Sequence, residues 1–193
     1  MRPIYITETA AGDDQAIVED FYHFYSSIPD GGIFGSMIGT EPVPDVYAAL
    51  NYAGEVRNGG HRQYIANADN RSIIHQAALL GLGEIGASVH RAILSEMRDW
   101  VIANPQAVEA IFDHDLPALD QLDDRFFDEQ DRHSVEAYCA AWIKAYPDLR
   151  IVSEAEFMAL LEGKALGVAS TATKPGGARV GLLERVMTTI FGR

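Results

Sequence analysis

Apolar residues recur at helical spacing along most of the chain. The clearest stripe takes positions i, i+3, i+4, i+7, i+8 and i+11, and comprises Ile74, Ala77, Ala78, Gly81, Leu82 and Ile85. This spacing places them on one face of an α-helix. Gly86 is then the expected C-cap, and Ser88 the expected N-cap of a second helix that repeats the stripe as far as Val101. We expect an antiparallel hairpin, in which Gly81 permits a close helix contact.

Similar patterns predict further helices elsewhere. Their expected positions are 13–27, 44–58, a start at Asn104–Pro105, 117–130, 134–146 and 153–163. Pro3 to Thr7 alternates as a short extended segment would, but nothing alternates for long enough to form a substantial sheet. The predicted fold class is therefore all-α, with residues 1–163 forming a single globular domain of about seven or eight helices.

The C-terminal part has a different composition. Residues 164–178 are small, polar and glycine-containing, which is typical of a flexible linker. Helical spacing returns in 179–193 with Leu183, Val186, Met187 and Ile190, which predicts a C-terminal amphipathic helix. Residues 162–193 contain five basic and two acidic residues, a net charge of +3. We expect this tail to fold back onto the acidic body; docking on a sister subunit or a membrane surface are the alternatives.

Charge and cysteine content narrow the possible functions. The 193 residues contain 28 acidic and 15 basic side chains, a net charge of −13. Such a chain repels nucleic acid phosphates and anionic membranes, so its electrostatic partners are basic. Cys139 is the only cysteine, so an intrachain disulfide is excluded. We expect its side chain to be buried. We expect a cytoplasmic protein, because the N-terminus lacks the apolar core of a signal peptide and no apolar run reaches the roughly 18 residues of a membrane span.

The acidity is concentrated between Glu109 and Glu136. These 28 residues contain ten acidic side chains and two arginines, a net charge of −8. Four acids follow i, i+4, i+8 and i+11, opposite an apolar face: Asp120, Asp124, Asp128 and Asp131. They would stand about 4.5–6 Å apart along a helix, a pitch comparable to that of DNA phosphates. The face is either a solvated surface or a binding surface, and its candidate residues are Asp113, Asp115, Asp120, Asp123, Asp124, Asp128 and Asp131.

The same residues do not form a calcium loop. Asp113 and Asp115 resemble the first ligands of an EF-hand, but Pro117 and Ala118 occupy the next ligand and glycine positions, and no glutamate closes the loop. We expect no metal and no cofactor.

A second group of polar residues surrounds a glycine pair in LNYAGEVRNGGHRQYIA. Asn58, Gly59 and Gly60 interrupt the helical pattern, and His61 restarts it at once. Glu55 and His61 could form an acid–base couple if the turn brought them together. The structural alternative, which we favour, is that this group ties down the turn: Glu55 would pair with Arg62 or another arginine, and Gln63 and Asn67 would bond to backbone. No recognised catalytic motif is present, and we expect no enzyme.

These residues carry a family resemblance. Glu55, Asn58, Gly59, Gly60, Gln63 and Asn67, followed by Ile85-Gly86-Ala87, make the segment Val46 to Trp100 resemble a bacterial family named for an acidic member that mimics DNA. Family members usually carry an aromatic residue where His61 stands, so this chain departs from the pattern there. The resemblance implies an all-helical, acidic and dimeric protein. For one branch it implies binding to a DNA-binding regulator, but mimicry depends on surface carboxylates and not on the glycine motif.

Three hypotheses follow. The first is an acidic, non-enzymatic protein that occupies the basic DNA-binding surface of a transcription factor or nucleoid protein. The second is an interaction or immunity-type regulatory module that uses the glycine turn, or an oligomer built by the tail. The third, a small hydrolase using Glu55 and His61, is the least favoured.

Overall fold

The computed structural model describes residues 2–27, 39–68 and 71–163. The predicted linker 164–178 and the predicted helix 179–193 lie outside the described residues. The elements follow the order β1 (Ile4–Thr7), a short 3-10 helix (Ala10–Gly12), α1 (Asp14–Ser26), α2 (Pro42–Asn67), α3 (Arg71–Glu84), α4 (Ser88–Ala103), α5 (Pro105–Glu109), α6 (Pro117–Arg132), α7 (Val135–Lys144), β2 (Leu149–Val152) and α8 (Glu154–Leu161). The all-α prediction is confirmed.

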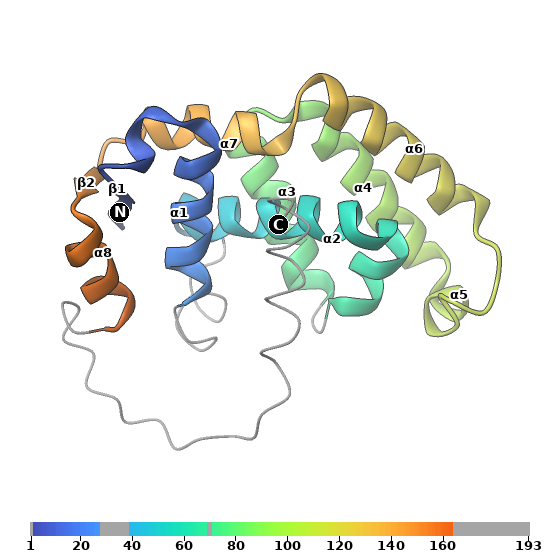
Figure 1. Ribbon diagram of the computed structural model, residues 1–193. Helices are drawn as coiled ribbons and strands as arrows, with labels where there is room; N and C mark the ends of the chain where they lie inside the picture. Colours follow the sequence, from blue (N-terminus) through green and yellow to red (C-terminus); the bar gives the residue numbers. More distant parts are fainter. Residues whose placement is uncertain (1, 28–38, 69–70, 164–193) are drawn as a thin grey trace, which may run out of the picture.

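The central element is α2, which crosses the middle of the molecule and contacts α1, α3, α6 and α7 (Figure 1). Its first half is buried almost throughout, from Val43 to Val56. A Cβ atom on Gly81 of α3 would overlap the backbone of Asp45 in α2. The close contact predicted for Gly81 therefore exists, and α2 is the helix that approaches it.

The hairpin of α3 and α4 is antiparallel, as predicted. Near its open end Arg98 Nη1 donates to Gln76 Oε1 at 3.3 Å, and near the turn Arg91 lies beside Gly83. Gly86 has a φ of 79° and ends the first helix. The prediction that Ser88 is an N-cap is wrong: Ala87 precedes the helix and Ser88 is its first residue. The reason is a turn one residue tighter than expected, in which the Ala87 N–H bonds to the Leu82 carbonyl at 2.9 Å.

A small parallel sheet was only half predicted. The extended segment at the N-terminus is β1, but β2 lay between two predicted helices and was not expected. The pair runs in register from Ile4 opposite Leu149 to Thr7 opposite Val152. Four residues with no alternating pattern cannot be recognised as a strand when their partner is almost the whole chain away. The sheet joins the N-terminal segment to the α7–α8 connection.

None of the helices in the described ranges is long and apolar enough to cross a membrane.

Candidate functional site

The helix α2 breaks at the glycine pair, as the sequence predicted. Gly60 has φ 72° and ψ −176°, a backbone conformation that is essentially restricted to glycine. Gly59 has φ −161° and ψ 28°. The chain is helical on both sides, so the pair divides α2 into two helical parts. His61 begins the second part and is completely buried.

Asp123 of α6 closes over this break. Its Oδ1 accepts the backbone N–H of His61 at 2.8 Å and lies 2.5 Å from the Nδ1 of the same residue. Because a carboxylate only accepts, Nδ1 carries the proton, and in the neutral ring Nε2 accepts from the Tyr52 hydroxyl at 3.0 Å. A Cβ atom on Gly60 would overlap the Asp123 carboxylate. The break in α2 is therefore the point where α6 is fixed to the core.

Glu55 belongs to a separate network. It is buried, and its Oε2 accepts from Gln63 Nε2 and from Asn67 Nδ2, both at 2.8 Å. The prediction that Gln63 and Asn67 bond to backbone is wrong, as is the pairing of Glu55 with Arg62. The two amides lie four residues apart in the second part of α2, so one carboxylate can receive both across the break. Glu55 thus links the two parts of the helix.

Because of these contacts, Glu55 and His61 do not form an acid–base couple. Each is held by different partners, and the His61 ring has no exposed surface with which to reach a substrate.

A second buried histidine, His90, packs against the ring of Phe126, with ring centroids 5.2 Å apart. Within the described ranges, no three histidine, cysteine or acidic side chains are grouped so that they could hold a metal ion.

The outer face of α6 carries most of the predicted acidic residues. Leu119, Leu122 and Phe126 are buried, which places the opposite side of the helix in solvent. Six of the seven predicted acids are exposed: Asp113, Asp115, Asp120, Asp124, Asp128 and Asp131. We call these six residues the acidic face. Asp123, the seventh, is half-buried and points to His61 instead.

Among the described residues, few cations neutralise the acidic face. Arg62 Nη2 lies 3.0 Å from Asp120 Oδ1, and Arg132 lies 4.0 Å from Asp128. The other four acids form no ion pair with any residue that the structure describes: Asp113, Asp115, Asp124 and Asp131. The remaining cation of α6 is engaged elsewhere. Arg125 donates to both carboxylate oxygens of Glu96 on α4, at 2.6 and 2.8 Å, which lowers the pKa of Glu96.

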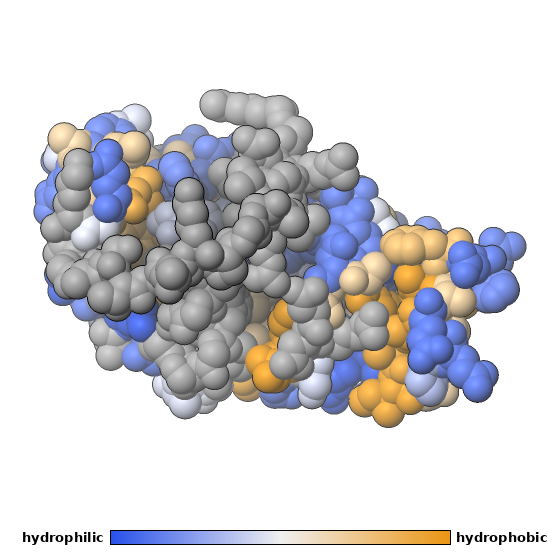
Figure 2. Space-filling model, turned by 90° about the horizontal axis from the view of Figure 1, so that it is seen from below, coloured by the Kyte–Doolittle hydropathy of each residue, from blue (hydrophilic) through white to orange (hydrophobic). Residues whose placement is uncertain are grey.

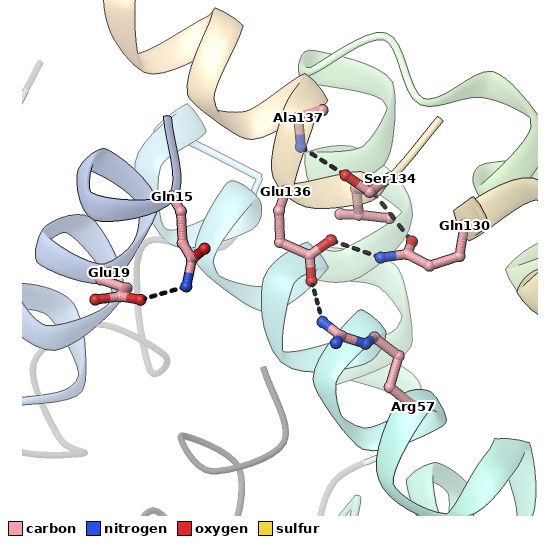
Figure 3. Close-up of polar contacts among 8 residues, drawn as sticks. Gln15, Glu19, Arg57, Gln130, Ser134, Glu136 and Ala137 are labelled. Atoms are coloured by element: carbon pink, nitrogen blue, oxygen red, sulfur yellow. Dashed lines mark hydrogen bonds and ion pairs between the residues drawn. The ribbon is translucent and has the colours of Figure 1, made fainter. Parts of the chain in front are cut away.

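A cleft of about 450 Å³, which the sequence did not indicate, lies at the C-terminal end of the acidic face. Its floor includes Glu136 of α7, which accepts from Arg57 at 3.0 Å and from Gln130 at 2.6 Å (Figure 3). Across from Glu136, Gln15 of α1 donates to Glu19 at 2.9 Å. Phe127 also lines the cleft. Its residues come from α1, α2, α6 and α7, so no local pattern could have indicated it.

Apolar side chains are exposed at the end of the molecule where α5 lies. Among the described residues, the two most exposed large apolar side chains are Ile102 (71%), near the end of α4, and Phe112 (66%), just after α5. Figure 2 shows apolar residues on the lower face at this end. Exposed apolar patches are common at protein–protein contacts.

Comparison with known protein families identifies the family of this chain. A family model described as DMP19-like protein matches residues 40–146, and the chain belongs to this family. The match includes the glycine break, the acidic face and α7, and it agrees with the resemblance carried by the glycine motif. No curated protein and no solved structure matches the chain.

Proposed function

We propose that this member of the DMP19-like family is a non-enzymatic, cytoplasmic protein that uses its acidic face to occupy the DNA-binding surface of a basic protein. The partner would be a transcription factor or a nucleoid protein. The observation that carries the proposal is the acidic face itself: six exposed carboxylates, four of which form no ion pair with a described residue. A surface of this kind attracts the lysines and arginines that otherwise contact phosphates.

The spacing of the carboxylates supports the proposal. Asp120, Asp124 and Asp128 follow one another at four-residue intervals on α6. At a rise of about 1.5 Å per residue, they stand roughly 6 Å apart along the helix axis. Phosphates repeat at about 3.4 Å along the axis of one DNA strand. A groove that contacts every second phosphate would therefore meet carboxylates at a comparable interval.

The rigidity of α6 also supports it. Three buried apolar residues fix the inner face of the helix, Asp123 binds the break in α2, and Arg125 binds Glu96 of α4. A surface that does not have to be ordered on binding loses less entropy when it meets its partner. Arg125 is directed away from the acidic face by its pairing with Glu96, so it neutralises Glu96 and leaves the negative charge of the face in place.

Isosteric neutralisation tests the proposal. The variant D120N/D124N/D128N removes three charges from the acidic face, and the matched control E8Q/E154Q/E156Q removes three charges from exposed positions near β1 and α8. On immobilised protein, the first variant is expected to lose the DNA-binding proteins that the wild type retains from native cell lysate, whereas the control keeps them. Equal retention by both variants would reject the acidic face as the binding surface.

We also propose that the protein is a homodimer, as the family resemblance implies. The exposed Ile102 and Phe112 supply an apolar patch that a second copy could cover. Light scattering coupled to gel filtration should give twice the mass of one chain, and I102E/F112E should reduce it to that of one chain. A monomeric wild type would reject the dimer, while a variant that stays dimeric would place the interface elsewhere.

A further inference from the structure

A groove between α3 and α4 has the opposite electrostatic character to the acidic face. It encloses about 420 Å³, which is within the size range of small-molecule sites. Its polar lining includes Arg91 and Arg98 from α4 and Gln76 from α3. None of the described residues that line it is acidic, although the whole chain has a net charge of −13. This lining favours an anionic ligand.

Arg91 is available to such a ligand. Its guanidinium lies beside Gly83 and forms no ion pair or hydrogen bond with any residue in the described part of the chain. By contrast, the guanidinium groups of Arg57 and Arg125 are each bound to a glutamate at 3.0 Å or less.

Arg98 is only partly satisfied. Its Nη1 donates to Gln76 Oε1 at 3.3 Å, and its Nη2 lies 3.8 Å from Asp99. The Nε atom is buried and has no acceptor among the described residues. A guanidinium carries five donor hydrogens, and a buried donor without an acceptor destabilises the structure. An anion in the groove would supply the missing acceptor.

The two arginines lie on the same side of the groove. They lie seven residues apart on the same face of α4, which corresponds to about 10 Å along the helix. Ser88 and Ser95 line the groove from that same face, and each hydroxyl can donate a hydrogen bond. Of the apolar lining, Ala92 of α4 is exposed, whereas Leu79 and Leu82 of α3 are only 6% and 0% exposed.

The start of α4 adds to the positive character of one end of the groove. Ser88 begins the helix, Ala87 provides no side-chain cap, and no acidic residue lies in the first turn. Neither the cap nor the first turn of α4 therefore compensates the partial positive charge of the helix N-terminus. Arg91, one turn further along α4, lies close to this end.

We propose that this groove binds an organic phosphate with two phosphate groups, of the size of a nucleoside diphosphate. One phosphate would lie between Arg91 and the start of α4, the second toward Arg98, and the organic part over Ala92. This site shares no residue with the acidic face, and the proposal does not depend on the proposed function.

Calorimetric titration of the full chain with ADP, pyrophosphate and inorganic phosphate tests the site, at low ionic strength in a phosphate-free buffer. We expect saturable binding of one ADP per chain, weaker binding of pyrophosphate and the weakest binding of phosphate. Arg91→Gln and Arg98→Gln should each weaken ADP binding at least tenfold. The matched control is Arg125→Gln, which removes a guanidinium held by Glu96 and should leave the ADP affinity unchanged.

A steric variant distinguishes a site in the groove from general attraction to arginine. A Cβ atom on Gly83 would lie 3.6 Å from the Arg91 guanidinium, so the larger side chain of Gly83→Leu should fill the space in front of it. This variant keeps both arginines and should also weaken ADP binding at least tenfold. The proposal is overturned if ADP gives no saturable heat at millimolar concentration, if binding survives in R91Q/R98Q, or if pyrophosphate binds but ADP does not. Circular dichroism melting confirms that each variant is folded.

Discussion

Asp123 and Asp124 are neighbours on α6, but they have different roles. The Asp123 carboxylate accepts the backbone N–H of His61 and contacts the imidazole, and only 21% of its side chain is exposed. Asp124 is exposed and forms no ion pair with a described residue. One residue of helix corresponds to a rotation of about 100°, which is enough to turn one carboxylate inward and leave the next in solvent. Two chemically identical side chains therefore have different roles: Asp123 holds α6 to the break in α2, and Asp124 is part of the exposed acidic face.

The same contrast extends to the whole of α6. Its inner face is fixed by apolar packing and by the bond from Asp123 to the break in α2. Its outer face carries charge that the described residues neutralise only in part, with ion pairs at Asp120 and Asp128. Net charge alone does not distinguish these two groups of acids. The distinction depends on which carboxylates already have a partner, and three experiments test it; a fourth tests a buried histidine beside α6.

Removal of the His61 ring should have the largest effect. His61→Ala leaves a cavity, removes the imidazole contact of Asp123 while keeping the backbone N–H bond, and leaves the Tyr52 hydroxyl buried without its bond. We expect a loss of about 3 kcal/mol in the free energy of unfolding, measured by urea denaturation. A change below about 0.5 kcal/mol, typical of a surface substitution, would show that α6 does not depend on this contact.

Gly60→Ala should have the next largest effect. The new Cβ would meet the Asp123 carboxylate, and the backbone conformation at this position strongly disfavours alanine. We expect a loss of about 2 kcal/mol. Gly12→Ala is the matched control, because nothing lies within 4 Å of a Cβ at that position and its φ is not in the left-handed region. Equal stability of the two variants would contradict the described geometry of the break.

The neighbouring aspartates can be compared directly. Asp123→Asn and Asp124→Asn change the charge equally. The first should cost about 1.5 kcal/mol, because its amide replaces a carboxylate that accepts two hydrogen bonds from His61. The second should cost less than about 0.5 kcal/mol. Similar losses of stability from both substitutions would contradict the different roles of the inner and outer faces of α6.

The smallest effect concerns pH. Burial lowers the pKa of His90, an effect that His133 increases and that Glu129, Glu136 and Gln130 oppose. Because the unfolded chain then binds a proton more readily than the folded chain, stability is full above the unfolded pKa of about 6.5 and falls as the pH drops below it. Urea midpoints between pH 8 and pH 5 should decline less in His90→Gln than in the wild type. Parallel declines would assign the acid sensitivity to other groups.

Much of the fold could be predicted from the sequence because its signals are local. The apolar stripe from Ile74 to Ile85 and the glycine break each determine their own segment, and each is found in the structure. The strand β2 could not be predicted, because its formation depends on pairing with β1 at the other end of the chain. The position of Ser88 was misjudged by one residue because the turn is closed by a backbone bond from Ala87.

The exposed acids of the candidate site could be predicted from the sequence, but the contacts of the individual side chains could not. Helical spacing indicated that Asp120, Asp124 and Asp128 share an exposed face, as they do. The inward orientation of Asp123 depends on the docking of α6 against the break in α2, a contact across 62 positions of sequence. The engagement of Arg125 by Glu96 likewise requires the arrangement of α4 beside α6. Such tertiary contacts decide which carboxylates remain free, and no local pattern reveals them.

The most direct test of the central claim is competition with DNA. The protein is immobilised, exposed to native cell lysate at low salt, and eluted either with a salt gradient or with duplex DNA, and the eluted proteins are identified by mass spectrometry. If the acidic face imitates DNA, duplex DNA displaces a basic DNA-binding protein, and the same protein elutes at moderate salt because its affinity falls with salt as that for DNA does. Retention of no such protein, or of a partner indifferent to both salt and DNA, would contradict the account.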